Sequence, residues 1–333
     1  MKKSNFLVVA LMAVAVCVGF ASCGDDDDEP SGGGGSKALF DASKLIGTWE
    51  SSDGSYYMEF KADGRCIGGE SNSDYPDVYV YSTDTQKGIV TVSDIRSTWS
   101  EDVEVTALTG QTLILTFKED GEEDEVETYK RYNGTKKPWT IDGYEFVNLG
   151  LSVKWASANV GASTSFDSGN YFQYGNPSTS RSAWKSDNYS LPMSDISGTS
   201  NDPATASMGG NWQLPTLEEM EELYSKCDWY LQTISGTRYW LVVQRGKDSN
   251  FIFLPFAGAY PLGTSNNSLL YDNYQCWLMT GTYNSSTRGP WILKGRYTNE
   301  TTSPDVNITT NEVQAISAMP IRAVSKASGD VTW

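Results

Sequence analysis

Short strand-like stretches repeat along residues 39–132, with turn-forming residues between them. Five of these stretches are only four or five residues long: Tyr56–Phe60, Val78–Tyr81, Gly88–Val92, Val103–Ala107 and Leu113–Phe117. Stretches of this length bounded by turn formers are typical of β-strands. Regular spacing of such strands favours a meander that closes on itself. The segment is therefore predicted to fold as a small all-β barrel.

Gly47 and Trp49 open this segment as a Gly-x-Trp motif, and Arg131 ends its last expected strand. With the strand pattern, these residues resemble the lipocalin-like domains of bacterial surface lipoproteins. The resemblance covers residues 39–132. It implies that Trp49 closes one end of the barrel and that Arg131 packs over it. A core position for Trp49 also follows from how often tryptophan is largely buried.

The first 22 residues have the anatomy of a lipoprotein signal peptide. Lys2 and Lys3 precede an apolar run of 15 residues, Phe6–Phe20, which is shorter than the about 20 residues that a membrane-spanning helix needs. The run ends in Ala21-Ser22-Cys23, which resembles a bacterial lipobox. That resemblance implies cleavage before Cys23 and acylation of its thiol. An ordinary secretory peptide with an incidental cysteine is the alternative.

Residues 23–38 are expected to be a tether between the lipid and the folded chain. Asp25–Glu29 resembles the lipoprotein export signal of Bacteroidetes, which implies an outer-membrane lipoprotein exposed on the cell surface. The alternative is a solvated acidic tail that carries no targeting signal. The Gly/Ser stretch Ser31–Ser36 is typical of a flexible linker.

Residues 133–138 contain turn formers, two lysines and a proline, and are predicted to link two domains. Five blocks in residues 139–325 closely resemble the Fibrobacter succinogenes major paralogous (FISUMP) domain: Val147–Gly161, Tyr171–Gly175, Gly209–Met220, Phe253–Gly258 and Met319–Val324. That family is similar to C-type-lectin-like folds, with a helix or two against an antiparallel sheet. The expected fold is therefore multidomain: an all-β lipocalin-like barrel, an α+β lectin-like domain and a tail, 326–333.

A helix is predicted to begin after Thr216. Thr216 and Glu219 have capping-box spacing, and Pro215 precedes the cap. Leu217, Met220, Leu223 and Tyr224 recur at helical spacing and indicate one apolar face, whereas Glu218, Glu221 and Glu222 are expected to face water. Three tryptophans in the family blocks are expected in the core: Trp155, Trp212 and Trp277.

Composition excludes several kinds of chemistry. The chain has no histidine, so Ser-His-Asp and Cys-His catalysis and HExxH zinc sites are excluded. Its formal net charge of -17 argues against a nucleic-acid partner. No calcium-lectin triplet, dinucleotide loop or paired-cysteine context occurs, so no catalytic residue, metal or cofactor is expected. Whether Cys227 and Cys276 form a bridge or remain free thiols is open at this stage.

The polar loops carry the candidate ligand contacts, because loops on a rigid scaffold often carry binding function. These candidates are Trp184, Tyr189, Asn266 and Asn273. The leading hypothesis is a non-catalytic surface lipoprotein, anchored in the membrane through Cys23, that binds or adheres to a glycan or to a host or envelope protein. The alternatives are a structural or assembly lipoprotein of the envelope and, more distantly, a carboxylate-based carbohydrate enzyme.

Overall fold

The computed structural model describes residues 38–327 except 72, 74, 119–122, 136–138, 187–189, 235, 247–249, 262–267, 297–304 and 311–314. The signal peptide, Cys23, the tether before Ala38 and the tail after residue 327 lie outside the described residues. Two of the candidate ligand contacts, Tyr189 and Asn266, also lie outside them.

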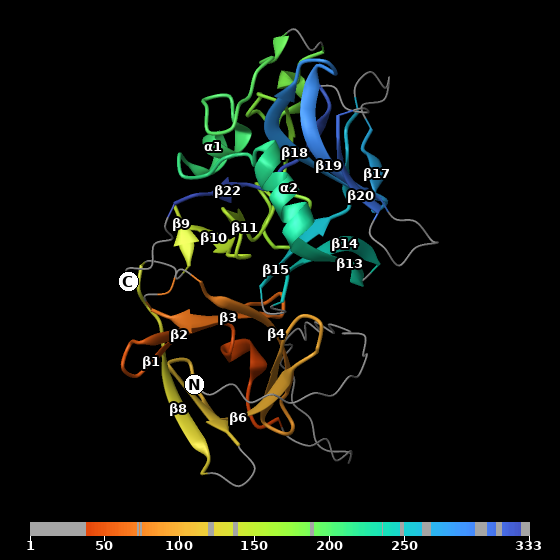
Figure 1. The fold of residues 1–333 in the computed structure, drawn as a ribbon. Helices are drawn as coiled ribbons and strands as arrows, with labels where there is room; N and C mark the ends of the chain where they lie inside the picture. Colours follow the sequence, from red (N-terminus) through yellow and green to blue (C-terminus); the bar gives the residue numbers. More distant parts are fainter. Residues whose placement is uncertain are drawn as a thin grey trace, which may run out of the picture.

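Eight strands form a closed antiparallel barrel in which each strand pairs with the next and β8 pairs with β1 (Figure 1). The strands are β1 (Gly47–Ser51), β2 (Tyr56–Phe60), β3 (Arg65–Glu70), β4 (Asp77–Asp84), β5 (Ile89–Ser93), β6 (Ser100–Leu108), β7 (Thr112–Phe117) and β8 (Glu125–Arg131). The predicted all-β barrel is confirmed.

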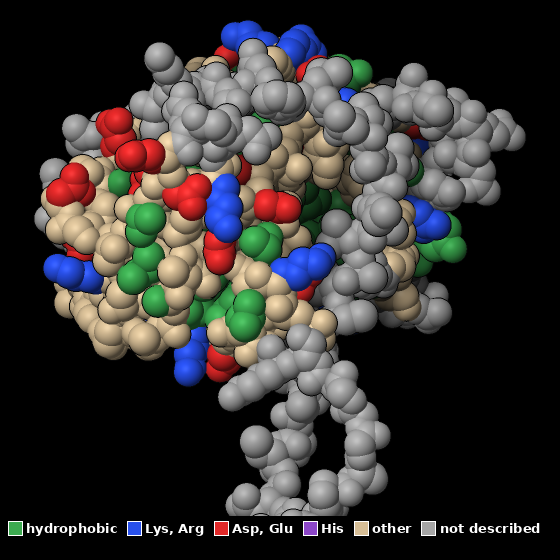
Figure 2. Space-filling view, turned by 90° about the horizontal axis from the view of Figure 1, so that it is seen from below, with side chains coloured by type: hydrophobic (Ala, Val, Ile, Leu, Met, Phe, Trp, Pro, Cys, Tyr) green, Lys and Arg blue, Asp and Glu red, His purple; other side chains and the backbone are tan. Residues whose placement is uncertain are grey.

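Alternating residues of these strands fill the barrel with apolar side chains, because successive side chains on a strand point to opposite faces. Its buried core consists of Phe40, Leu45, Trp49, Phe60, Cys66, Val90, Val103, Val105, Leu113, Leu115 and Tyr129. Cys66 is a free thiol, and burial raises its pKa. The view from below in Figure 2 shows acidic and basic side chains next to one another on this side of the molecule, with hydrophobic side chains between them.

Trp49 and Arg131 close one end of the barrel together with the 3-10 turn Ala42–Lys44. The Trp49 ring is fully buried, and its Nε1 donates to Leu45 O at 2.8 Å. The Arg131 guanidinium lies 3.8 Å from the centre of that ring. Arg131 Nη1 also donates to Ile46 O at 2.8 Å, and its Nη2 donates to Lys44 O. A cation that stacks on an aromatic face and donates to two backbone carbonyls fixes this end of the barrel.

The C-terminal part (residues 139–327) is built from small antiparallel sheets and two helices. One sheet has the order β22 (Val324–Ser325), β11 (Lys154–Ala156), β10 (Tyr144–Val147) and β9 (Thr140–Ile141). Two others join β13 (Cys227–Ile234), β14 (Thr237–Gln244) and β15 (Phe251–Pro255), and β18 (Gln275–Asn284), β19 (Gly289–Arg296) and β20 (Asp305–Thr309). Two-stranded pairs are β12 (Tyr171–Gln173) with β21 (Ala318–Pro320), and β16 (Ala257–Ala259) with β17 (Leu270–Asp272).

The helices are α1 (Pro203–Met208) and α2 (Leu217–Lys226), and the capping box at the start of α2 is present. Met220 and Leu223 are fully buried on one face of α2, as are Trp155 and Trp212 elsewhere in the same core. Tyr224, which was expected on the same apolar face, is 43% exposed. Glu222 faces water only in part, and its carboxylate accepts from Ser152 N at 2.9 Å and pairs with Lys226 at 2.8 Å. No helix among the described residues has both the length and the hydrophobicity needed to cross a membrane.

The outer face of the barrel packs into the hydrophobic core of the C-terminal part. Tyr57, Ile67 and Val78, on the outer faces of β2, β3 and β4, are buried in the cluster that contains Trp139 and the C-terminal core. Asn250 joins the two parts by polar contacts, because its amide accepts from Val78 N at 3.1 Å and donates to Pro76 O at 3.2 Å. Figure 1 shows these strands lying between the rest of the barrel and the C-terminal part.

Candidate functional site

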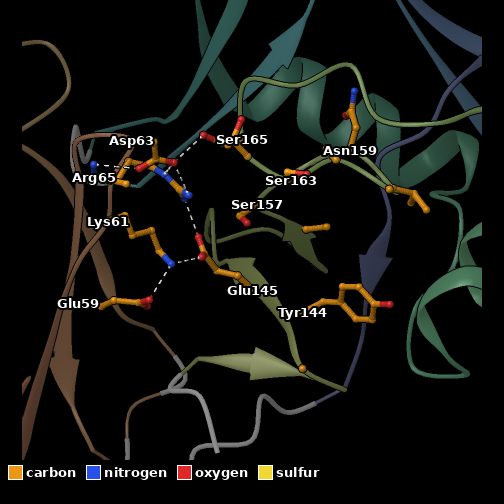
Figure 3. A pocket seen from close by; sticks show the side chains of 18 of the residues that line it. Glu59, Lys61, Asp63, Arg65, Tyr144, Glu145, Ser157, Asn159, Ser163 and Ser165 are labelled. Atoms are coloured by element: carbon orange, nitrogen blue, oxygen red, sulfur yellow. Dashed lines mark hydrogen bonds and ion pairs between the residues drawn. The ribbon is translucent and has the colours of Figure 1, made fainter. Parts of the chain in front are cut away.

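A groove of about 670 Å³ lies where the barrel meets the C-terminal part, and both contribute its walls (Figure 3). The barrel supplies residues 59–65, which are the end of β2, the turn and the start of β3. The C-terminal part supplies residues 143–145, around the start of β10, and the loop 156–165 that follows β11. A groove of this size is within the range of small-molecule sites.

Five charged side chains form an ion cluster across the floor of the groove: Glu59, Lys61, Asp63, Arg65 and Glu145. Glu145 of β10 pairs with Lys61 at 2.6 Å and with Arg65 at 2.6 Å, so it ties the barrel to the C-terminal part. Lys61 also pairs with Glu59 at 3.0 Å, and Arg65 pairs with Asp63 at 2.9 Å. Every member of the cluster therefore has an opposite charge beside it.

The protonation state of Glu145 follows from this arrangement. Burial by itself would raise the pKa of this carboxyl, but the charges of Arg65 and Lys61 outweigh it and lower the pKa to about 2. The same pairs raise the pKa of Arg65 and of Lys61 against the effect of burial. Glu145, Arg65 and Lys61 are therefore ionised at neutral pH.

Hydroxyl and amide groups line the rest of the groove. Ser157, Ser163, Asn159 and Asn170 lie along its C-terminal wall. Ser165 reaches across the groove, and its Oγ donates to Asp63 Oδ2 at 3.2 Å. Ser157, Asn159 and Ser165 are themselves buried, so the exposed Ser163 and Asn170 offer the donors and acceptors on this wall.

Arg322 holds the wall loop in place. It is fully buried, and its guanidinium donates to Asn159 Oδ1 at 2.9 Å, Ala156 O at 2.9 Å and Phe253 O at 2.6 Å. Burial lowers the pKa of Arg322 to about 9. Since buried polar groups must be hydrogen-bonded, the three acceptors fix the start of the loop against β15.

Tyr144 places an exposed aromatic ring at the edge of the groove. Its side chain is 42% exposed, its hydroxyl donates to Ser207 O at 3.1 Å, and its ring packs edge-on against Trp212. The contacts at both ends of the side chain keep this ring in position.

The candidate contacts predicted from the sequence lie elsewhere in the C-terminal part. Trp184 follows the 3-10 turn η2 (Arg181–Ala183), and its ring lies tilted against that of Tyr260 with the ring centroids 5.4 Å apart. Asn273 lies in the turn after β17, where its amide accepts from Arg238 N at 2.7 Å and donates to Gly236 O at 2.9 Å. The structure does not bring Trp184 or Asn273 into the groove.

Sequence reasoning missed the groove residues, because no motif contains them. Arg65 and Glu145 are 80 positions apart and belong to segments that were assigned to different domains. The only local signal is the alternation of acid and base at Glu59, Lys61, Asp63 and Arg65, which is also typical of an ordinary solvated strand.

Among the residues that the structure describes, no three His, Cys, Asp or Glu side chains are grouped to hold a metal ion. Cys227 and Cys276 are buried free thiols, and burial raises the pKa of each to about 12. No protein-family model matches the chain, and no curated protein matches it. The fold and groove thus define a strand-rich, two-part chain with a closed barrel as one wall of a polar groove.

Proposed function

We propose that this chain is a non-catalytic binding module, and that its groove takes a neutral, hydroxyl-rich ligand such as a short glycan. The observation that carries the proposal is the combination of hydroxyl and amide groups on one wall with an ion cluster whose charges are already paired. Such a surface offers many hydrogen bonds while it leaves no uncompensated cation to demand an anionic ligand.

Tyr144 supports the same ligand class. A fixed, half-exposed tyrosine ring presents an apolar face beside polar groups, and this combination matches the C–H face and the hydroxyl edge of a sugar ring. Because the ring is held by Ser207 and Trp212 before any ligand arrives, little conformational entropy is lost on binding.

The state of Glu145 supports a binding role over a hydrolytic one. A carboxyl that acts as a general acid needs a raised pKa, whereas the pKa of Glu145 is lowered to about 2 by its two cations. The other two carboxylates of the cluster are also engaged with Lys61 and Arg65.

We further propose a lipidated surface protein built from a lipocalin-like barrel and a FISUMP-type domain with C-type-lectin-like ancestry. The lipobox-like Ala21-Ser22-Cys23 and the acidic run after it support the proposed location on the cell surface. The closed barrel, with Arg131 stacked on Trp49 at one end, supports the first resemblance. The five sequence blocks in residues 147–324 support the second resemblance.

A direct binding experiment tests the role of the groove. The purified full chain is screened against neutral oligosaccharides of different monomers, and the best ligand is titrated by calorimetry. Tyr144→Ala is expected to weaken binding by about tenfold, the effect of losing an aromatic contact with the ligand. Tyr224→Ala is the matched control, because Tyr224 is 43% exposed but lies on α2, outside the groove.

Ser163→Trp gives a second test, because a bulky ring would fill the groove from its wall. Equal loss of binding in Tyr144→Ala and Tyr224→Ala would contradict the assignment of the site. Saturable binding of an envelope protein without any glycan binding would favour the assembly role. Turnover of an oligosaccharide that Glu145→Gln abolishes would replace the proposal with a hydrolase.

A further inference from the structure

A second group of aromatic side chains lies on the C-terminal part, away from the groove. The rings of Trp184 and Tyr260 are 5.4 Å apart, and the guanidinium of Arg181 lies 4.1 Å from the centre of the Tyr260 ring. Tyr171 meets the Tyr260 ring edge-on at 4.9 Å. Trp184 and Tyr260 are partly exposed and Arg181 is exposed. We call these four side chains the aromatic ladder.

Two buried amides hold the loop that carries the ladder. Gln173 accepts from Lys185 N at 2.6 Å and donates to Lys185 O at 2.9 Å, so both backbone groups of Lys185 are fixed. Asn176 donates to Ala183 O at 3.1 Å. Gln173 is 2% exposed and Asn176 is 9% exposed, so their hydrogen bonds are protected from water. Trp184 therefore sits between two anchored residues.

Two cations accompany these rings. Arg181 and Lys185 are exposed, and among the described residues neither one forms an ion pair with a carboxylate. This is notable in a chain with 42 acidic and 25 basic residues, where cations such as Lys61, Arg65 and Lys226 are paired. Two cations that have no ion pair within the described part of an acid-rich chain, beside a fixed aromatic surface, favour binding of an anion.

The chemistry of the ladder defines the ligand class. A guanidinium stacked on a tyrosine ring keeps its N–H edge free for a bidentate contact with a carboxylate or a sulfate. The partly exposed Trp184 ring offers an apolar face for the C–H side of a sugar ring. We propose that the aromatic ladder with Lys185 is a second binding site, for a glycan that carries an anionic pyranose unit.

This site goes beyond the proposed function of the groove. The ladder and Lys185 share no residue with the groove lining, and an anionic ligand differs in charge from the neutral ligand proposed there. An experiment can therefore contradict the proposal for one site and leave the proposal for the other site unaffected.

Calorimetry on the full chain with three oligosaccharides of equal length tests the proposal. The first is an oligogalacturonate, the second is its neutral methyl ester, and the third is a sulfated oligogalactan without carboxylates. At least one anionic probe is expected to bind about tenfold or more tighter than the methyl ester, the gain from one charge-assisted hydrogen bond. The stronger of the two anionic probes identifies carboxylate or sulfate as the natural group.

Three variants locate the site. Arg181→Gln and Lys185→Gln are each expected to weaken anionic binding by about tenfold and to leave the methyl ester unaffected. Lys130→Gln is the matched control, because Lys130 is an exposed cation on β8 of the barrel. Trp184→Ala is expected to weaken all three probes. Arg181→Gln and Lys185→Gln alter only exposed side chains, so they test the location of the site even if Trp184→Ala does not fold.

Several results would overturn the proposal: no saturable binding of either anionic probe, equal binding of acid and ester, or equal loss in Lys130→Gln and Arg181→Gln. Tyr144→Ala tests whether the anionic probe binds in the groove instead. Loss of anionic binding in Tyr144→Ala with normal binding in Arg181→Gln would assign the anion to the groove and remove the second site.

Discussion

Gly47 occupies a position that other residues cannot take without strain. Its φ is +126°, and a Cβ built there would lie 2.3 Å from Arg131 Nη1. A side chain would therefore add backbone strain and also displace the guanidinium from the Trp49 ring. The Gly-x-Trp motif thus has a steric explanation that needs no ligand.

Gly47→Ala is expected to lower the free energy of unfolding by about 1–3 kcal/mol, the range for a residue held in a sparsely populated backbone region. Urea denaturation followed by tryptophan fluorescence measures the change. Gly110→Ala is the control, because no atom lies within 4 Å of a Cβ at that position. Equal destabilisation by the two substitutions would contradict the steric explanation.

Arg322 has the same kind of structural role in the C-terminal part. Arg322→Lys is expected to lower the free energy of unfolding by about 2–4 kcal/mol. A lysine ammonium cannot reach all three acceptors, so buried polar groups are left without partners. Thermal unfolding measures the loss. Arg245→Lys changes an exposed ion pair with Asp228 and should cost less than about 1 kcal/mol. A neutral Arg322→Lys variant would show that the loop is held by other contacts.

At the scale of single elements, α2 was predictable because its signals are local. Thr216 and Glu219 lie three residues apart, and the structure shows both hydrogen bonds of the box, at 3.3 and 2.9 Å. The apolar spacing of Met220 and Leu223 then defines the buried face. The capping box, the apolar spacing and the burial agree, so this helix could be predicted without knowledge of tertiary contacts.

Thr216→Ala should reduce stability by about 1 kcal/mol, since it removes the acceptor for Glu219 N at the start of α2. Thr216→Ser keeps the hydroxyl and should remain close to the wild type. Chemical denaturation of both variants provides the comparison. If Thr216→Ser lost as much stability as Thr216→Ala, the packing of the threonine methyl group would be the cause.

Strand β3 was not predicted, and its glycines explain why. Gly68 and Gly69 are typical of a turn in a sequence, but both lie inside a paired strand. A Cβ at Gly68 would lie 2.5 Å from Tyr56 Oη, and a Cβ at Gly69 would lie 3.3 Å from Trp139 Cζ2. The glycines thus admit a tyrosine inside the barrel and a tryptophan outside it. Only the tertiary contacts reveal this requirement.

At the scale of the whole molecule, the groove could not be predicted because its residues meet through long-range packing. Periodicity predicts strands and helices but does not state which outer face of the barrel meets β10. Residues 133–138 were predicted to link two domains, and Tyr57, Ile67 and Val78 of the first are buried in the core of the C-terminal part. The site is a product of that packing.

The ion cluster predicts a specific dependence on pH. The pKa of Glu145 falls from an ordinary 4.5 to about 2 in the folded chain. Because the folded-state pKa is the lower one, the stabilisation is complete above the ordinary pKa and is lost as the pH falls through the folded-state pKa. At neutral pH, Glu145→Gln should cost about 1–3 kcal/mol, because it leaves Lys61 and Arg65 less compensated.

Unfolding curves measured at intervals from neutral pH to about pH 2 test this dependence. The wild type should lose more stability over the acid range than Glu145→Gln, so the two curves should converge at low pH. Parallel curves would show that Glu145 titrates alike in the folded and unfolded chains. Glu221→Gln, an exposed glutamate on α2, serves as the control.

Asn250 should determine whether the chain unfolds in one step. It is fully buried, and its amide bonds to Val78 and Pro76 of the barrel and to Asn148 O at 2.7 Å. The wild type is expected to show one calorimetric transition, and Asn250→Ala is expected to split it in two by uncoupling the parts. Asn273→Ala breaks contacts within the C-terminal part only and should lower the transition without splitting it.

The shared interface also determines how the chain carries mechanical load. A force applied between the N-terminal end of the barrel and the C-terminal part does not pass through the peptide connection after β8 alone. It also loads the side-by-side contacts of β2, β3 and β4, where Asn250 and Glu145 cross between the parts. We therefore expect a pulling force to act as shear on the packed interface between the two parts. The interface contacts then resist the force together.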